Sequence, residues 1–244
     1  MTLLKLPPPG YRYDGKPVKP VVAWSHSAIT SYEDCPQRFY AVRILGWPDP
    51  PGPALIKGRR VHEAGANYLQ VPNSPLPNEY KRFAGLMEQL RSLNPYADLK
   101  MTFTPRWSLG REGWFGKDVW LRLEWDAGVV YQSDRHADIV DFKTGKRYDD
   151  KNDDQMELYA LSAFIKFRSP AVLTRLWYLD SGIEIVGPGD NRKPYTIDQM
   201  TPLLNKWNQR ANAMLNATSY PPRPNKFCEY CPVSSRKGGP CAEG

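Results

Sequence analysis

Apolar and polar positions recur with helical or strand spacing along most of this sequence, and the pattern predicts a mixture of both elements. Helical spacing runs through residues 25–44, 57–70, 78–93, 154–167 and 198–216, with Ser25 or Ser27 as the N-cap of the first helix. Strand patterns cover residues 101–109, 114–126, 129–131, 137–143, 172–179 and 183–186. Because the helix at 154–167 connects two strands, we expect an α/β fold around a central sheet.

Breaks in this pattern divide the chain into four expected segments. Residues 1–22 are rich in proline and lack periodicity, which predicts an extended arm. A helical region at 23–100, a core at 101–218 and a cysteine-bearing tail at 219–244 follow. No apolar run approaches the ~18 residues that span a bilayer, and the first residues are too short for a signal peptide. We therefore expect a soluble cytoplasmic protein without a membrane partner.

The composition favours a polyanionic partner. Lys and Arg number 33 against 26 Asp and Glu, giving a net charge of +7 and a pI near 9.2. Nucleic acid is the first candidate. Basic residues that we expect to follow the path of a nucleic-acid strand, as a group, are Arg38, Arg43, Lys57, Arg59, Arg60, Lys146, Arg147 and Lys151.

The most informative segment is the strand at 137–143, which ends in an Asp-x-Lys pair. Successive strand side chains point to opposite faces, so Asp141 and Lys143 share one face while Phe142 points to the other. A carboxylate can hold a divalent metal, and an ammonium can orient water or steady charge on a phosphate. Taken alone the pair is weak, because such pairs are common on solvated strands.

Further candidates flank this strand on both sides. Asp126 precedes Ala-Gly, a turn signal, and is expected at a strand end facing Asp141. Glu124, two residues earlier on the same face, is an alternative acid. His62 lies upstream on a helix, and one His with two Asp suits Mg²⁺ or Mn²⁺. Gln155 and Tyr159 are four residues apart on the following helix, so they face the same way.

The four cysteines are placed at both ends of the sequence. Cys35 lies in the first helical region, and Cys228, Cys231 and Cys241 lie in the tail. In a reducing compartment such a set favours metal or cluster ligation over disulfides. Four thiolates suit either an iron-sulfur cluster or tetrahedral zinc, and a site of this kind would clasp two distant segments together.

Taken together, these motifs resemble the PD-(D/E)XK nuclease superfamily. The order is Gly-x-x-x-His-Glu at 58–63, then Asp126, Asp-Phe-Lys-Thr-Gly at 141–145, and Gln-x-x-x-Tyr at 155–159. Within the superfamily, the order is similar to the RecB-like exonucleases. One N-terminal and three C-terminal cysteines are similar to their iron-sulfur branch, which includes the AddB nuclease domain and the exonuclease of CRISPR adaptation modules. The resemblance covers roughly residues 24–241.

The resemblance implies a restriction-endonuclease-like core, with N-terminal helices and C-terminal tail joined by a metal cluster. It implies Mg²⁺ or Mn²⁺ on Asp126 and Asp141, completed by His62 and the carbonyl of Phe142, with Lys143, Gln155 and Tyr159 in catalytic roles. It further implies a 4Fe-4S cluster on Cys35, Cys228, Cys231 and Cys241, with zinc as the alternative. The Cys-x2-Cys-x9-Cys spacing has a longer second interval than the family pattern leads one to expect.

The expected function is that of an exonuclease acting on single-stranded DNA or DNA ends. Recombination, repair or spacer acquisition in a bacterium or phage-infected cell would use it, with a recombination or CRISPR-adaptation protein as partner. A non-catalytic DNA-binding subunit that keeps the fold and a zinc or iron-sulfur clasp is the alternative.

Overall fold

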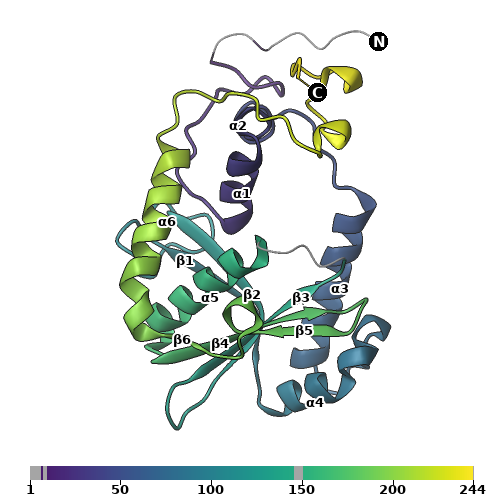
Figure 1. Cartoon of the computed structure of the whole chain (residues 1–244), viewed down its shortest axis with the longest axis vertical. Coiled ribbons are helices and arrows are strands. Elements are labelled where there is room, and N and C mark those ends of the chain that lie inside the picture. Colours follow the sequence, from purple (N-terminus) through teal and green to yellow (C-terminus); the bar gives the residue numbers. More distant parts are fainter. Residues whose placement is uncertain (1–6, 8–9, 146–150, 244) are drawn as a thin grey trace. The chain divides into compact units, whose positions relative to one another are not determined.

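The structure, a computed structural model, describes residue 7 and residues 10–145 and 151–243 (Figure 1). Chain contacts divide it into two compact units. We call Pro51–Lys206 the sheet unit, and Met1–Pro50 with Trp207–Gly244 the terminal unit. This division differs from the four expected segments, because residues from both ends of the sequence pack into one unit.

The sheet unit is built on one mixed sheet, which confirms the expected α/β class. Its strands are β1 (Tyr96–Phe103), β2 (Leu121–Val130), β3 (Ala137–Lys143), β4 (Ala171–Tyr178), β5 (Ile183–Val186) and β6 (Tyr195–Thr196). The order is β1-β2-β3-β4-β5, with β6 also paired to β4. Only β3 and β4 are parallel among these pairs. The crossover between them is α5 (Lys151–Phe167), as the pattern predicted.

Helices cover both faces of this sheet (Figure 1). On one face α3 (Pro53–Gln70), a 3₁₀ helix (Asn78–Phe83) and α4 (Ala84–Ser92) pack against Val140 and Phe142 of β3. The intervening residues of β3, Ile139 and Asp141, point to the opposite face, which α5 covers. The central strand β3 therefore presents Val140 and Phe142 to one layer and its candidate acid Asp141 to the other.

Three strand predictions were wrong at their boundaries. The predicted strand at 101–109 is β1, which begins earlier, at Tyr96, and ends at Phe103. A turn follows in which Trp107 has a left-handed backbone conformation, with φ of 56°. The predicted strands at 114–126 and 129–131 are one strand, β2, preceded by a loop. Asp126 consequently lies inside a strand and not at its end.

The terminal unit is held together by contacts between the two ends of the sequence. It contains α1 (His26–Asp34), α2 (Pro36–Phe39), a π-helical turn (Tyr40–Ile44), and the second part of α6 (Met200–Leu215). Ser25 caps α1 by accepting from the Ala28 N–H at 3.3 Å. The Trp24 and Trp207 rings stack at 5.8 Å between centroids. The Arg210 guanidinium binds both carboxylate oxygens of Glu33, at 2.7 and 2.6 Å.

The first predicted helix, at 25–44, is broken at Cys35. This residue has an extended backbone, with φ of −162° and ψ of 104°, because the ring of the following Pro36 disfavours helical geometry before it. Cys35 therefore lies at the junction of two helices. Among the described residues, no helix has both the length and the apolar character needed to cross a membrane.

Candidate active site

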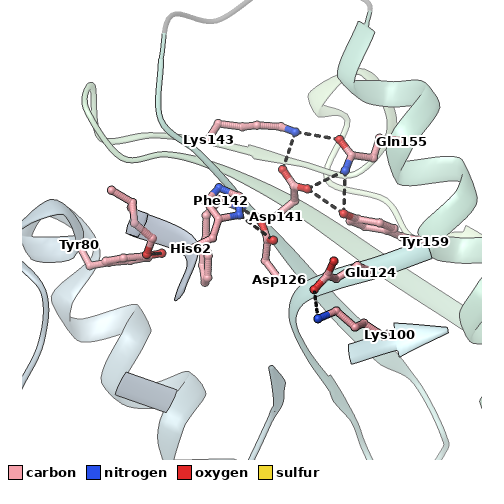
Figure 2. Close-up of polar contacts among 11 residues, drawn as sticks. His62, Tyr80, Lys100, Glu124, Asp126, Asp141, Phe142, Lys143, Gln155 and Tyr159 are labelled. Atoms are coloured by element: carbon pink, nitrogen blue, oxygen red, sulfur yellow. Dashed lines mark hydrogen bonds and ion pairs between the residues drawn. The ribbon is translucent and has the colours of Figure 1, made fainter. Parts of the chain in front are cut away.

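Four side chains from β3 and α5 form one hydrogen-bonded network (Figure 2). Lys143 Nζ lies 2.7 Å from Asp141 Oδ2 and donates to Gln155 Oε1 at 2.8 Å. Asp141 Oδ1 accepts from the Tyr159 hydroxyl at 2.9 Å and from Gln155 Nε2 at 3.0 Å. Gln155 Nε2 also donates to the Tyr159 oxygen at 2.7 Å. The strand face and the helix face predicted from their spacings thus meet.

Asp126 and His62 lie beside this network and contact each other (Figure 2). Asp126 Oδ1 is 2.8 Å from His62 Nδ1, and Asp126 Oδ2 accepts from the backbone N–H of Phe142 at 2.7 Å. The ladder between β2 and β3 ends at the pair Ala127–Val140. Beyond that pair, the Asp126 carboxylate accepts the hydrogen bond from β3 that a backbone carbonyl of β2 would otherwise accept. This bond fixes the position of the Asp126 carboxylate relative to Asp141.

The direction of Asp126 depends on a change of face within β2. The Trp125 indole donates to Ser162 of α5 at 2.9 Å, whereas Ala127 packs in the cluster on the α3 side. Gly128 permits this change, because a Cβ there would lie 2.8 Å from Cε3 of the Trp125 ring. The Ala-Gly pair that suggested a turn instead makes room for the tryptophan on the same strand.

Phe142 is supported from the α3 side. The Tyr80 ring contacts it edge-on, with centroids 4.9 Å apart, and the Tyr80 hydroxyl donates to the Val61 carbonyl at 3.1 Å. This hydroxyl lies so close to Gly65 that a Cβ on residue 65 would collide with it. Gly65 therefore lets Tyr80 lie between α3 and β3, where it packs against Phe142, the residue between Asp141 and Lys143.

All the candidate active-site residues line one cavity of about 630 Å³. Besides Arg59, which was expected along the nucleic-acid path, three charged residues to which the sequence reasoning gave no role line it: Glu63, Asp98 and Lys100. Lys100 pairs with Glu124 at 3.4 Å, since the two residues are opposite each other in the β1–β2 register. Antiparallel pairing of the two strands would have located Lys100, had the first strand been predicted to begin before residue 101.

Burial and mutual charge shift the protonation equilibria of this site. Burial raises the pKa of Asp126 and the charge of Asp141 raises it further, which outweighs the hydrogen bonds from His62 and Phe142. Burial lowers the pKa of His62, but its hydrogen bond to Asp126 and the two carboxylate charges raise it on balance. Burial likewise opposes charge on Lys143, yet Asp141 raises its pKa overall. Lys143 therefore remains an ammonium at neutral pH.

The residues present fit a hard divalent cation. Asp141 Oδ2 is buried without a hydrogen-bond partner, despite its ionic contact with Lys143. Burial and the nearby charge of Asp141 raise the pKa of Asp126, and a cation beside the two carboxylates would offset both effects. In the described part of the chain, no three His, Cys, Asp or Glu side chains are already grouped around a metal position. Mg²⁺ matches this arrangement, because it usually takes one or two carboxylates and completes its shell with water.

The cysteines belong to the terminal unit, where Cys35, Cys228 and Cys231 all lie within electrostatic reach of Cys241. Burial raises the pKa of the Cys241 thiol, and the charges of Cys35, Cys231 and Cys228 raise it further. Cys231 and Cys241 pack in the same apolar cluster with Trp47, and the Asn225 N–H donates to Cys228 Sγ at 3.3 Å. The Asn225 amide also donates to the Asp34 carbonyl at 3.1 Å, beside Cys35.

A comparison with protein families shows which superfamily this chain belongs to. A family model described as the PD-(D/E)XK nuclease superfamily matches residues 23–127 and 115–236. The chain belongs to this superfamily, and family and site together indicate a metal-dependent nuclease. A solved structure described as "Crystal structure of SSO0001" is similar at 15% identity with a TM-score of 0.44, covering 88% of this chain and 85% of that one. A comparison with curated proteins gave no match.

Of the basic group expected along a nucleic-acid path, Lys57 pairs with Asp180 at 3.3 Å and Arg38 with Asp49 at 3.0 Å. Arg59 lines the cavity. Lys146, Arg147 and the side chain of Lys151 lie outside the described residues. The group therefore contributes one residue to the cavity wall in the described part of the chain.

Proposed function

We propose that this chain is a metal-dependent DNA exonuclease that hydrolyses phosphodiester bonds in single-stranded DNA or at DNA ends. The observation that carries the proposal is the convergence of Asp126, Asp141 and Lys143 on one cavity. Resemblance to the RecB-like exonucleases supports the choice of substrate. We propose that it acts in recombination, repair or spacer acquisition. Its partner would be a protein from one of these processes.

The metal-binding part of the proposal assigns Mg²⁺ or Mn²⁺ to Asp126 and Asp141. The remaining ring nitrogen of His62, Nε2, and the carbonyl of Phe142 complete the protein ligands. When bound, a divalent ion supplies Lewis-acid stabilisation of the charge that develops on the phosphate. The bond from His62 Nδ1 to Asp126 fixes which imidazole nitrogen remains for this role.

Lys143 acts as a permanent positive charge and not as a base. The carboxylate of Asp141 keeps its pKa raised, so the ammonium cannot accept a proton from water at neutral pH. It instead holds a phosphate oxygen and orients the attacking water, which stabilises the charge that grows in the transition state. Gln155 positions it by accepting its hydrogen bond at 2.8 Å.

Gln155 and Tyr159 are positioning residues in this proposal. Both donate to Asp141 Oδ1, which turns Oδ2 of the same carboxylate towards its ionic partner. Burial and the charges of Asp141 and Asp126 raise the pKa of the Tyr159 hydroxyl, so it remains a donor across the physiological range.

The test measures cleavage of end-labelled DNA by wild-type protein and by Asp141→Asn and Lys143→Gln. Both variants should lose about 100-fold or more in rate, the order expected when preorganised charge is removed from a transition state. Asp180→Asn is the control, because Asp180 is exposed and its ion pair is with Lys57, which is exposed as well. Cleavage by either site variant at the wild-type rate would overturn the assignment of the site.

Circular and linear single strands separate exonuclease from endonuclease action. The linear strand should be degraded with Mg²⁺ or Mn²⁺ and not with EDTA, while the circular strand persists. Equal cleavage of both would contradict exonuclease action. Folded wild-type protein that binds DNA yet cuts neither strand would instead establish the alternative, a non-catalytic DNA-binding subunit.

We also propose that the terminal unit holds a 4Fe-4S cluster on Cys35, Cys228, Cys231 and Cys241. The proposal is supported by the electrostatic interaction of Cys241 with the other three thiols and by the N–H donor to Cys228 Sγ. Such a cluster would join two segments that lie far apart in the sequence, a closure that stabilises the unit by restricting its unfolded chain.

Metal analysis of protein purified without oxygen tests the cluster. Iron and acid-labile sulfide should be present in equal amounts, and Cys231→Ser should lose both together with thermal stability. One zinc ion per chain without iron would show that the four thiolates form a zinc site.

A further inference from the structure

We propose that the loop between β1 and β2 holds a single-stranded DNA segment next to the active site, with Phe115 as a stacking platform for a base. This inference rests on the proposed nuclease function and names how its substrate is held. Phe115 is 84% exposed, the highest value among the large apolar side chains in the described part of the chain. Single exposed apolar side chains are common on protein surfaces, so the inference depends on the groups that surround this ring.

The loop presents this ring in a fixed position. The carboxylate of Glu112 accepts from the Lys117 N–H and that of Asp118 accepts from the Arg111 N–H, each at 2.8 Å. The turn between them begins at Gly113, whose φ of 81° is in the left-handed region. At the base of the loop the Trp107 and Trp120 rings pack edge to face at 5.4 Å. A preorganised ring loses little conformational entropy when a base stacks on it.

Arg122 connects the loop to the strand that carries Asp126. Its Nε donates to the Trp114 carbonyl at 2.8 Å, and its guanidinium carbon lies 5.5 Å from the centroid of the Phe115 ring. A guanidinium beside an aromatic ring offers a phosphate partner and a stacking surface at one place. The two groups therefore suit one nucleotide, with its phosphate on Arg122 and its base on Phe115.

The path from Phe115 to the cavity follows one face of β2. Arg122 and Glu124 are spaced by two residues, so they share a face of β2, while Leu121, Leu123 and Trp125 are buried. Glu124 and Asp126 already line the cavity. Four residues of strand separate Asp126 from Arg122, about 13 Å at ~3.3 Å per residue. A short run of unstacked nucleotides spans that length.

The charge around the ring suits a nucleic acid better than a protein strand or a second copy of the chain. Arg106, Arg111 and Lys117 are exposed on the loop. The two acids of the loop are used by backbone N–H donors, which reduces their repulsion of phosphates. Because every base has a π-face but duplex bases are already stacked, the platform selects single strands without reading their sequence.

The test measures binding of a labelled single strand of about 16 nucleotides, near the upper limit for one binding fold, in EDTA so that no cleavage is needed. Phe115→Ala should weaken binding about 10-fold, the order reported for losing one base–aromatic stack. Phe115→Trp should restore it. Leu93→Ala, which removes another exposed apolar side chain, 41% exposed, from the end of α4, should bind as wild type. Thermal unfolding of Phe115→Ala should match wild type, because the ring is exposed.

Cleavage with Mg²⁺ is measured separately on the wild-type protein. If the wild type cleaves DNA but Phe115→Ala binds the single strand as tightly as wild type, the inference is overturned and the proposed function stands. If binding depends on Phe115 but the wild type cleaves nothing, the loop binds DNA and the nuclease proposal fails. An equal loss of affinity for blunt duplex DNA would also overturn the inference, since a stacking platform requires unpaired bases.

Discussion

Gly128 is predicted to be the residue at which the smallest change does most harm to the active site. Replacing it by alanine places a Cβ 2.8 Å from Cε3 and 3.1 Å from Cζ3 of the Trp125 ring, and 3.3 Å from the carbonyl oxygen of Asp138. The ring cannot give way, because Trp125 is fully buried and its indole N–H is bonded to Ser162 at 2.9 Å. The strand must therefore shift, and Asp126 lies between the two colliding residues.

The expected cost follows from these contacts. Overpacking a close-packed core costs about 1–3 kcal/mol, and replacing glycine restricts the unfolded chain, which offsets about 0.4–1 kcal/mol. A net loss of about 1–2 kcal/mol lowers the Tm of a chain of this length by roughly 2–8 °C. A displacement of Asp126 by about 1 Å reduces the rate of DNA hydrolysis by up to ~100-fold.

Gly85→Ala is the matched control. Gly85 lies in α4 and is exposed, and a Cβ there meets no atom within 4 Å. The same substitution should raise stability by about 0.5–1 kcal/mol, because alanine has the higher helix propensity. Thermal unfolding and hydrolysis of end-labelled DNA with Mg²⁺ are measured on both variants. If Gly128→Ala were as stable and as active as Gly85→Ala, the Trp125 ring could not occupy the space that sets the direction of Asp126.

Three further outcomes are expected. Asp126→Asn should abolish cleavage without lowering the Tm of metal-free protein, because the substitution removes a buried charge that repels Asp141. Mg²⁺ at 100 times its Kd should stabilise the wild type by about 2.7 kcal/mol. An equal stabilisation of the variant by Mg²⁺ would refute the metal assignment. Tyr159→Phe should slow cleavage about 10-fold, consistent with the ~1–2 kcal/mol of one buried hydrogen bond to Asp141, and an unchanged rate would show that the hydroxyl does not position that carboxylate. His62 has a pKa raised on balance by Asp126 against the effect of burial, so its contribution to metal-free stability is complete below its ordinary value of 6.5 and is lost as the pH rises through the higher folded value. Urea unfolding at about pH 6 and about pH 8, either side of the ordinary histidine pKa, should show this loss in the wild type and not in His62→Gln, and identical pH dependence in both would exclude the pairing with Asp126.

The strand β3 and helix α5 were predictable because their patterns are uninterrupted and their spacings are local. Asp141 and Lys143 are two apart on a strand, and Gln155 and Tyr159 are four apart on a helix, so each pair had to share a face. The crossover topology between parallel strands then brings the two faces together, and the structure shows all four side chains in contact.

The path of β2 was not predictable, because it depends on packing between residues that the local pattern does not relate. Ala127 and Gly128 read as a turn by composition, and only the position of the Trp125 ring shows why glycine is required inside a strand. The same holds for Lys100, whose place in the cavity follows from its register with Glu124. Asp126 was identified through the family motif, while the reason for its direction came from the structure.

The composition of the terminal unit has a consequence for how the chain is made. Its two parts are separated by Pro51–Lys206, a stretch of 156 residues. At about 5–20 residues per second, a ribosome takes roughly 10 to 30 s to produce that stretch. The sheet unit is continuous, so it can begin to fold while it is being made. Cys35 is synthesised before this stretch, and Cys228, Cys231 and Cys241 are synthesised after it. All four thiols can therefore bind a metal together only after the whole sheet unit has been synthesised.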